Sequence, residues 1–80
     1  MARYFFDVID GRTISDEAGI DLPDLAAVRR EAVRLLPEIA RDEIHKYDCD
    51  AQTLALMVRD EAGQPVYIAN LSYAGIWLRS

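Results

Sequence analysis

The sequence predicts an α+β domain, residues 1–80, in which a single Pro-kinked helix covers one face of a four-stranded sheet. The segments at each end of the chain alternate apolar and polar residues as strands do, and the segment between them repeats its apolar residues at helical spacing. The resulting order is strand, strand, helix, strand, strand. A core of this size is marginal for an isolated domain, and oligomerisation is a common remedy.

The composition argues against several classes of protein. Hydrophobic residues make up 51% of the chain and charged residues 29%, which is typical of a folded globular domain. The formal charge of −5 argues against nucleic acid as a partner, because affinity for phosphates depends on Lys and Arg. Cys49 has no second cysteine to pair with, and no apolar run reaches the ~18 residues of a membrane span. Without a signal-peptide pattern at the N-terminus, we expect a cytoplasmic protein that does not bind membranes.

The first strand, Arg3–Ile9, carries large apolar side chains on both faces. Alternation assigns Tyr4, Phe6 and Val8 to the side that faces the helix. It assigns Phe5, Asp7 and Ile9 to the outer side. The dipeptide Asp10-Gly11 predicts a two-residue turn that pairs Asp7 with Ile14, whereas the hydrophobic pattern prefers Val8 opposite Ile14 across a longer loop. A slip of one residue exchanges the faces, so both registers stay open. A second turn at Asp16-Glu17-Ala18-Gly19 then leads to the helix.

The segment around Leu22-Pro23-Asp24-Leu25 is predicted to open the helix, with Asp24 as the N-cap whose carboxylate accepts from free first-turn amides. Its apolar residues recur at helical spacing and predict one buried stripe, made of Leu25, Val28, Ala32, Leu35, Leu36, Ile39 and Ile44. Pro37 removes a backbone donor and clashes with the preceding turn. Because the stripe keeps its phase across Pro37, we expect one kinked helix or two collinear helices.

The last two strands, Thr53–Arg59 and Val66–Tyr73, flank Asp60-Glu61-Ala62-Gly63, which is typical of a type I turn with a glycine bulge. If Asp60 pairs with Gln64, the register pairs Val58 with Val66, Leu56 with Ile68 and Met57 with Tyr67. One set of side chains then lies under the helix, namely Leu54, Leu56, Val58, Val66 and Ile68. The other set points outward, namely Ala55, Met57, Tyr67, Ala69, Leu71 and Tyr73.

An outer face this apolar predicts that copies of the chain associate. Its large side chains expose on the order of 600 to 1,000 Å², against ~300 to 600 Å² for the largest patch of a typical monomer. The end of the chain from Tyr73 to Leu78 is also apolar, and Trp77 is its expected anchor. We therefore expect a homodimer or higher oligomer whose interface contains Phe5, Ile9, Met57, Tyr67, Leu71, Tyr73 and Trp77.

The polar residues do not predict a chemical site. Asp10-Gly11 followed by Glu17 matches only the second half of a calcium-binding loop. His45 and Cys49 lie near Asp48 and Asp50, but the chain has one His and one Cys. An enzyme would need a pocket where at least two acid-base candidates converge, from Asp7, Asp10, Glu17 and His45. We expect a non-enzymatic protein with no catalytic, cofactor-binding or metal-binding residues.

The chain resembles a family of small bacterial proteins classed as a domain of unknown function. The motifs that carry the resemblance are Arg3-Tyr4-Phe5-Phe6-Asp7, Asp10-Gly11, Asp16-Glu17-Ala18-Gly19, Leu22-Pro23-Asp24-Leu25, Arg30-Glu31-Ala32 and Val58-Arg59-Asp60-Glu61-Ala62-Gly63. Because the family has no assigned activity, the resemblance implies no functional residue. The Leu22-Pro23-Asp24-Leu25 segment and the helix after it are also weakly similar to HicB-type antitoxins, acidic proteins that block a basic toxin. The expected function is a small interaction module of unknown role, with an acidic, antitoxin-like regulator of a basic protein as the alternative.

Overall fold

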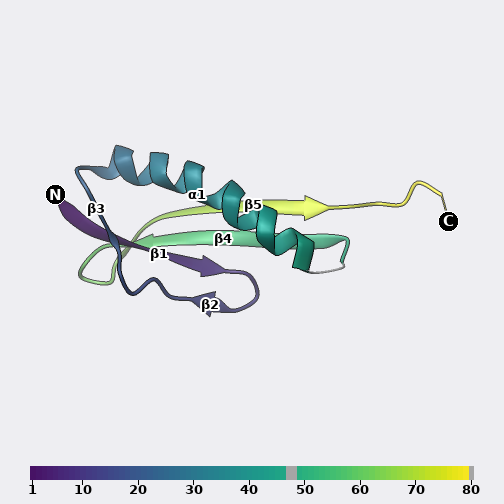
Figure 1. Cartoon of the computed structure of the whole chain (residues 1–80), viewed down its shortest axis with the longest axis horizontal. Helices are drawn as coiled ribbons and strands as arrows, with labels where there is room; N and C mark the ends of the chain where they lie inside the picture. The colour runs from purple at the N-terminus through teal and green to yellow at the C-terminus, as the bar shows by residue number, and fades with distance from the viewer. Residues whose placement is uncertain (47–48, 80) are drawn as a thin grey trace.

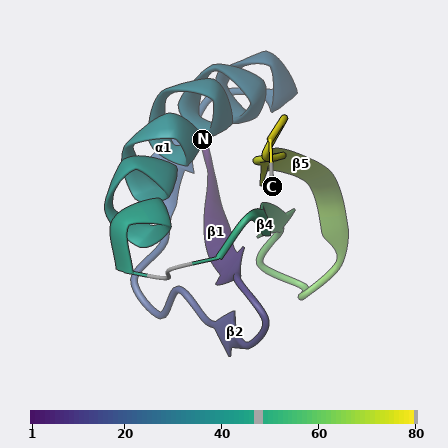
Figure 2. The ribbon, with the colours of Figure 1, turned by 90° about the vertical axis from the view of Figure 1, so that its right-hand side faces the viewer.

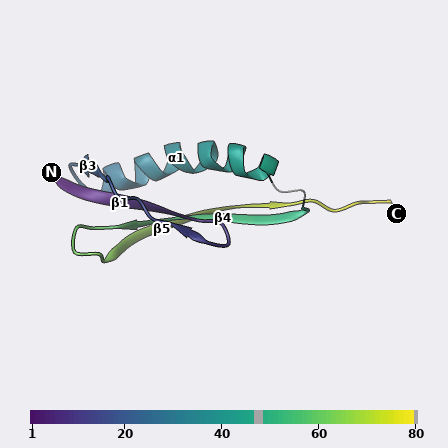
Figure 3. The same cartoon turned by 60° about the horizontal axis from the view of Figure 1, so that its bottom comes forward.

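The computed structural model describes residues 1–46 and 49–79, which form one antiparallel sheet with a single helix on one face (Figures 1 and 3). The predicted α+β class with one helix is confirmed. The elements are β1 (Ala2–Ile9), β2 (Thr13–Ile14), β3 (Ile20–Leu22), α1 (Leu25–Lys46), β4 (Ala51–Arg59) and β5 (Pro65–Ala74). The sheet has five strands rather than the predicted four, because the chain pairs with β1 twice before it enters the helix.

The strand β1 organises the first half of the chain. On one side it pairs with β4, and on the other side it pairs with β2 near its end and with β3 near its start, which gives the order β2-β1-β4-β5 with β3 also on β1. The longer-loop register of the first hairpin holds, since Val8 lies opposite Ile14 and Ile9 opposite Thr13. In that loop Gly11 has φ +100°, a conformation that side chains with a Cβ rarely adopt.

The helix α1 runs uninterrupted across Pro37, which is exposed. Its N-cap is as predicted, because the backbone N–H of Ala27 donates to Asp24 Oδ1 at 2.8 Å. The buried residues of the helix are Ala27, Val28, Ala32, Leu36 and Ala40, with Leu35, Ile39 and Ile44 partly buried beside them. The prediction was wrong for Leu25, which is 60% exposed. Leu25 is the first residue of α1 and lies at the N-terminal end of the helix.

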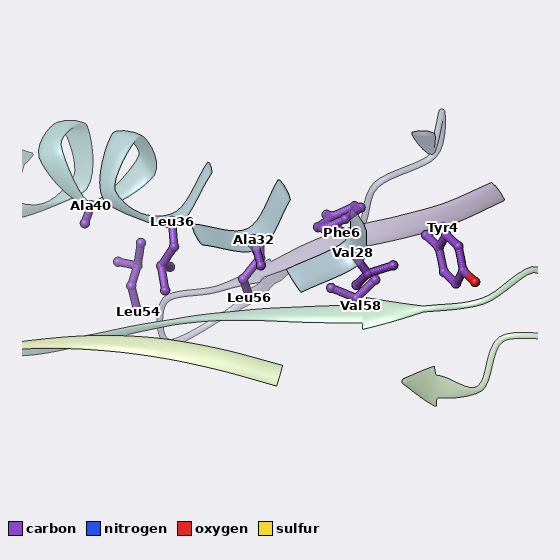
Figure 4. Close-up of a cluster of buried hydrophobic side chains, with 9 residues drawn as sticks. All are labelled: Tyr4, Phe6, Val28, Ala32, Leu36, Ala40, Leu54, Leu56 and Val58. Atoms are coloured by element: carbon purple, nitrogen blue, oxygen red, sulfur yellow. The ribbon is translucent and has the colours of Figure 1, made fainter. Parts of the chain in front are cut away.

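The core lies between α1 and the faces of β1 and β4 that point toward it (Figure 4). The side chains of Leu54, Leu56 and Val58 are each at most 1% exposed, and Phe6 is 6% exposed. The predicted helix-side positions of Tyr4, Phe6 and Val8 are confirmed, since all of them belong to this core or pack against it. The helix meets the sheet through small residues, notably Ala32, which is fully buried.

The turn between β4 and β5 has the predicted form. The Asp60 N–H donates to the Gln64 carbonyl at 2.9 Å, the Gly63 N–H donates to the Asp60 carbonyl at 3.0 Å, and Gly63 has φ +83°. The predicted register nevertheless fails two residues later. A bulge inserts Val66, so Val58 lies opposite Tyr67 rather than Val66, and Leu56 lies opposite Ala69.

This one-residue shift exchanges the faces of β5 relative to the prediction. The residues predicted to point outward, namely Tyr67, Ala69, Leu71 and Tyr73, share the helix side with Leu54 and Leu56. Tyr67 and Ala69 pack against the core there. Ile68, predicted under the helix, lies on the outer side opposite Met57 and is 55% exposed. The predicted outer row of aromatic residues is therefore wrong.

The register predicts that Tyr67 and Ile68 differ in their contribution to stability. Tyr67→Ala should lower the free energy of unfolding by about 2 to 4 kcal/mol, because it removes a side chain packed on the core. Ile68→Ala should cost less than about 1 kcal/mol, because Ile68 is half exposed. Urea denaturation of the two variants measures both values, and the opposite ranking would contradict the bulged register.

Candidate functional site

A polar network lies on the outer face of the sheet, where the segment after β2 folds over β1 and β4. Asp7 is 7% exposed, and its carboxylate accepts from Arg59 Nε at 2.8 Å and from the Asp16 N–H at 2.9 Å. Arg59 also donates to the Asp16 carbonyl at 2.9 Å, and its guanidinium lies 4.7 Å from the centre of the Phe5 ring. The network therefore links β1, β4 and the loop before β3.

Asp16 is the centre of this network. Its Oδ2 accepts the Phe6 N–H at 3.1 Å, and its Oδ1 accepts the N–H groups of Ala18 and Gly19 at 3.0 and 3.1 Å. Burial raises the pKa of Asp16, but the hydrogen bonds from Phe6, Gly19 and Ala18 and the charge of Arg59 outweigh it. The pKa of Asp16 consequently lies below its ordinary value, and the carboxylate is ionised at neutral pH.

Gly19 closes the loop against the sheet. It has φ +76°, and a Cβ at this position would lie 2.8 Å from Arg3 Cγ and 2.9 Å from Phe5 Cε2. Arg3 donates to the Ala18 carbonyl at 2.6 Å and forms an ion pair with Asp21 at 3.2 Å. Residues from three sequence motifs therefore lie in contact here, namely Arg3–Asp7, Asp16–Gly19 and Arg59–Gly63. These contacts hold the loop before β3 against the sheet.

The network leaves little capacity for chemistry. The Asp7 and Asp16 oxygens all accept hydrogen bonds from within the chain, and Arg59 is held by Asp7. Of the other acid-base candidates, Glu17 and His45 are exposed. Across residues 1–46 and 49–79, no three side chains of His, Cys, Asp or Glu come together as a metal site.

The predicted group around Cys49 is only partly visible, since Asp48 lies outside the described residues. The Cys49 thiol is free and exposed and donates to the Ala51 carbonyl at 3.4 Å. Asp50 is exposed and lies next to the segment that follows β5, where its carbonyl accepts the Gly75 N–H at 2.6 Å. These contacts join the start of β4 to the end of β5 and do not form a ligand set.

Asp10 is the one buried carboxylate in the described part of the chain that lacks hydrogen-bond partners. Its side chain is 1% exposed, neither oxygen accepts a hydrogen bond, and Arg12 Nε lies 3.9 Å from Oδ1. An isolated carboxylate with one distant cation is costly to bury. Because no group of three or more His, Cys, Asp or Glu side chains forms among the described residues, Asp10 does not supply the several ligands that a cation needs.

Two of the surface depressions formed by the described residues are open and shallow. One, of about 220 Å³, is lined by Asp50, Tyr73, Gly75, Ile76 and Trp77, and the other, of about 250 Å³, by Glu38, Arg41 and Asp42 on α1. Pockets for small molecules are usually enclosed and measure ~300 to 1,000 Å³. The first depression is better described as the start of an apolar surface, because Ile76 and Trp77 are 83% and 84% exposed.

The structure places the predicted interface residues of the strands in four different environments. Phe5 lies under Arg59, and Ile9 and Met57 are half-buried on the outer face. Tyr67 packs on the core, whereas Leu71 and Tyr73 lie on the helix side of β5 and remain 42% and 45% exposed. Sequence reasoning missed Ile68 as an exposed apolar residue, and it included Ile76 and Leu78 only as part of the apolar end of the chain. The signal for Ile68 was Pro65, which lacks the N–H of a regular ladder residue and stands beside the bulge.

The lowered pKa of Asp16 predicts a pH-dependent contribution to stability. A carboxylate whose folded-state pKa is depressed stabilises the fold above its unfolded-state pKa of ~3.9, and this contribution disappears as the pH falls through the folded-state value. Asp16→Asn should therefore lower the free energy of unfolding by about 1 to 2 kcal/mol at pH 7 and by much less at pH 3. Urea denaturation at both pH values measures this, with the exposed Glu17→Gln as control. A loss of equal size at both pH values would contradict the role of the charge.

A comparison with protein families relates the chain to known sequences. The profile of a family described as a domain of unknown function, DUF6894, matches residues 3–72. No curated protein and no solved structure matches the chain significantly. The matched range contains β2, β3, α1 and β4 and most of β1 and β5, and it ends before the exposed apolar segment that follows β5. The chain therefore belongs to the DUF6894 family, a domain of unknown function.

Proposed function

We propose that this protein is a small non-enzymatic interaction module that associates with itself as a dimer or higher oligomer. The observation that carries the proposal is a continuous stretch of chain, β5 and the segment 75–79, in which most large apolar side chains are exposed. These are Ile68, Leu71, Tyr73, Ile76, Trp77 and Leu78, with exposed fractions of 55%, 42%, 45%, 83%, 84% and 93%.

The exposure has a structural cause. Leu54 and Leu71 lie opposite each other on the same face of the sheet, yet Leu54 is 1% exposed and Leu71 is 42% exposed. The helix therefore covers β4 and leaves this part of β5 open, as Figure 2 shows with α1 on one side and β5 on the other. Beyond β5, the segment 75–79 continues past the end of α1, and none of the helices and strands in the described residues lies over it (Figure 1).

The size of this surface favours a partner. At ~150 to 250 Å² for a fully exposed large side chain, the six residues expose on the order of 600 to 1,000 Å². The largest apolar patch of a typical monomer is ~300 to 600 Å². Self-association also suits a domain of 80 residues, whose own core is small.

No helix among the described residues is long and apolar enough to cross a membrane. The proposal places the module in the cytoplasm, and the free, exposed thiol of Cys49 is compatible with a reducing compartment. Of the predicted interface, the proposal keeps Leu71, Tyr73 and Trp77 at its centre. It assigns Tyr67 to the core and Phe5 to the polar network.

The proposal predicts the mass of the protein in solution. At micromolar concentration, light scattering should give at least twice the 9.0 kDa mass of the chain. Trp77→Ala and Leu71→Asp should each weaken association at least tenfold, because they remove an anchor or bury a charge. The control is Val33→Asp, since Val33 is 59% exposed on α1 and is not part of this surface. A monomeric wild-type protein would overturn the proposal.

A second candidate is an acidic regulator that binds a basic protein. The net charge of −5 favours it, as does a group of carboxylates around Arg3, where Asp21 forms an ion pair and Glu61 accepts the backbone N–H at 3.2 Å. Complementary charge of this kind steers association with a cationic partner.

The two candidates differ in their salt dependence. The regulator predicts that a cationic protein co-purifies at low ionic strength, dissociates at about 1 M salt, and is lost from an Asp21→Lys, Glu61→Lys double variant. Pull-down of tagged protein followed by mass spectrometry tests this. Retention of the same cationic protein by the double variant would exclude the acidic surface as its binding site.

A further inference from the structure

The outer edge of β5 is open. The sheet ends with β5, which has β4 on one side and, in the described residues, no strand on the other. The strand spans ten residues, Pro65 to Ala74, so a long row of backbone N–H and C=O groups faces outward.

This edge lacks the features with which folded proteins protect edge strands. Such strands usually carry charges, prolines, bulges or a covering loop. In β5 only the beginning is protected, by Pro65 and by the bulge at Val66. From Tyr67 to Ala74 the strand has no charged residue and no proline.

Charge points to the partner. A chain with a formal charge of −5 repels its own copies unless the surfaces that meet are neutral. Of the strands with more than two residues, β5 alone has no charged side chain, since β1, β3 and β4 contain Asp7, Asp21 and Arg59. Two copies can therefore meet along β5 without bringing charges together.

We propose that two copies pair antiparallel along β5, about a two-fold axis at Leu71, to form one continuous sheet. This inference rests on the proposed self-association and names the surface and register through which it occurs. A two-fold contact uses the same surface on both copies, and one open edge satisfies that requirement.

The register follows from matching side chains across the axis. With Leu71 opposite Leu71 of the second copy, Asn70 lies opposite Ser72, and Ile68 lies opposite Ala74. Polar residues then face polar residues and apolar residues face apolar ones, which favours pairing. An axis at Asn70 would instead place Ile68 opposite Ser72, and an axis at Ser72 would place Asn70 opposite Ala74.

The same register brings the segment after β5 to the bulged beginning of β5 in the other copy. Ile76 and Trp77 of one copy come close to Val66 and Pro65 of the other. These two residues belong to the segment 75–79, which follows β5 and leaves the body of the domain (Figure 1), and they are 83% and 84% exposed. Pairing therefore buries apolar side chains in addition to satisfying the backbone.

A disulfide tests this register directly. In a Cys49→Ser background, Leu71→Cys places two thiols on the two-fold axis, where opposite Cα atoms are ~4.5 to 5.5 Å apart and a disulfide can form. Air oxidation should convert most of this variant to a covalent dimer on a non-reducing gel. The matched control is Tyr73→Cys, which lies on the same face with a similar exposed fraction of 45% against 42%. Its two copies lie four positions apart, roughly 13 Å, and should not crosslink.

The outcomes separate this inference from the proposed function. Crosslinking at position 71 and not at position 73 supports the register. A protein that is dimeric by light scattering but crosslinks at neither position, or equally at both, overturns the β5 register and leaves self-association intact. A monomeric protein overturns both proposals.

A second set of variants applies if Leu71→Cys does not fold. The double variant Asn70→Lys, Ser72→Lys and its counterpart Asn70→Asp, Ser72→Asp place like charges opposite each other and should each weaken the dimer at least tenfold. Mixing the two should restore dimerisation as a heterodimer, which native mass spectrometry resolves. Failure of the mixture to associate overturns the register.

Discussion

The first part of the chain is held to the sheet by the carboxylate of Asp16. On the edge of β1 that faces β2 and β3, the ladder covers residues 2–4 and 8–9 and leaves a gap between them. Asp16 accepts the Phe6 N–H in this gap, and its other oxygen folds the loop by accepting from Ala18 and Gly19. A side chain thus replaces the missing strand. The path into β3, and from there into α1, depends on this one group.

Arg59 extends the same constraint to the second half of the molecule. It lies at the end of β4, reaches Asp7 and the Asp16 carbonyl, and covers the Phe5 ring. The outer face of the sheet is therefore occupied by the chain's own polar network near this end. Alternation along β1 alone predicts that Phe5 and Asp7 are solvent-exposed on the outer face. In the structure both side chains contact Arg59 instead.

Local signals in the sequence predict local structure well. The N-cap at Asp24, the helix across Pro37 and the glycine turn at Gly63 each depend on residues within a few positions of one another, and each is found. The helix-side positions of β1 were also predictable, because Tyr4, Phe6 and Val8 alternate regularly. The split of the second strand into β2 and β3 was not predictable, because it depends on a hydrogen bond between Asp16 and a strand ten residues away.

The candidate surface was predicted in part. Trp77, Leu71 and Tyr73 are exposed, as predicted. Leu71 and Tyr73, however, lie on the helix side of β5, whereas alternation assigned them to the outer side. Both faces of β5 are apolar over Val66, Tyr67 and Ile68, so hydrophobicity does not distinguish one register from the other. The register is determined by the bulge at Val66, which adds one residue to β5. The bulge contains no charged residue and no glycine that would have predicted it from the sequence.

The bulge at Val66 determines which face each residue of β5 occupies. With Val66 unpaired, Tyr67, Leu71 and Tyr73 are in phase with the core and Ile68, Asn70 and Ser72 are out of phase. Loss of Val66 itself, with the turn unchanged, would bring Tyr67 directly after Pro65 and leave it opposite Val58, so both sets would keep their faces. Loss of one residue after the bulge, such as Ile68, would instead place Asn70 and Ser72 under the helix. The strand therefore accommodates a one-residue change of length at the bulge but not further along.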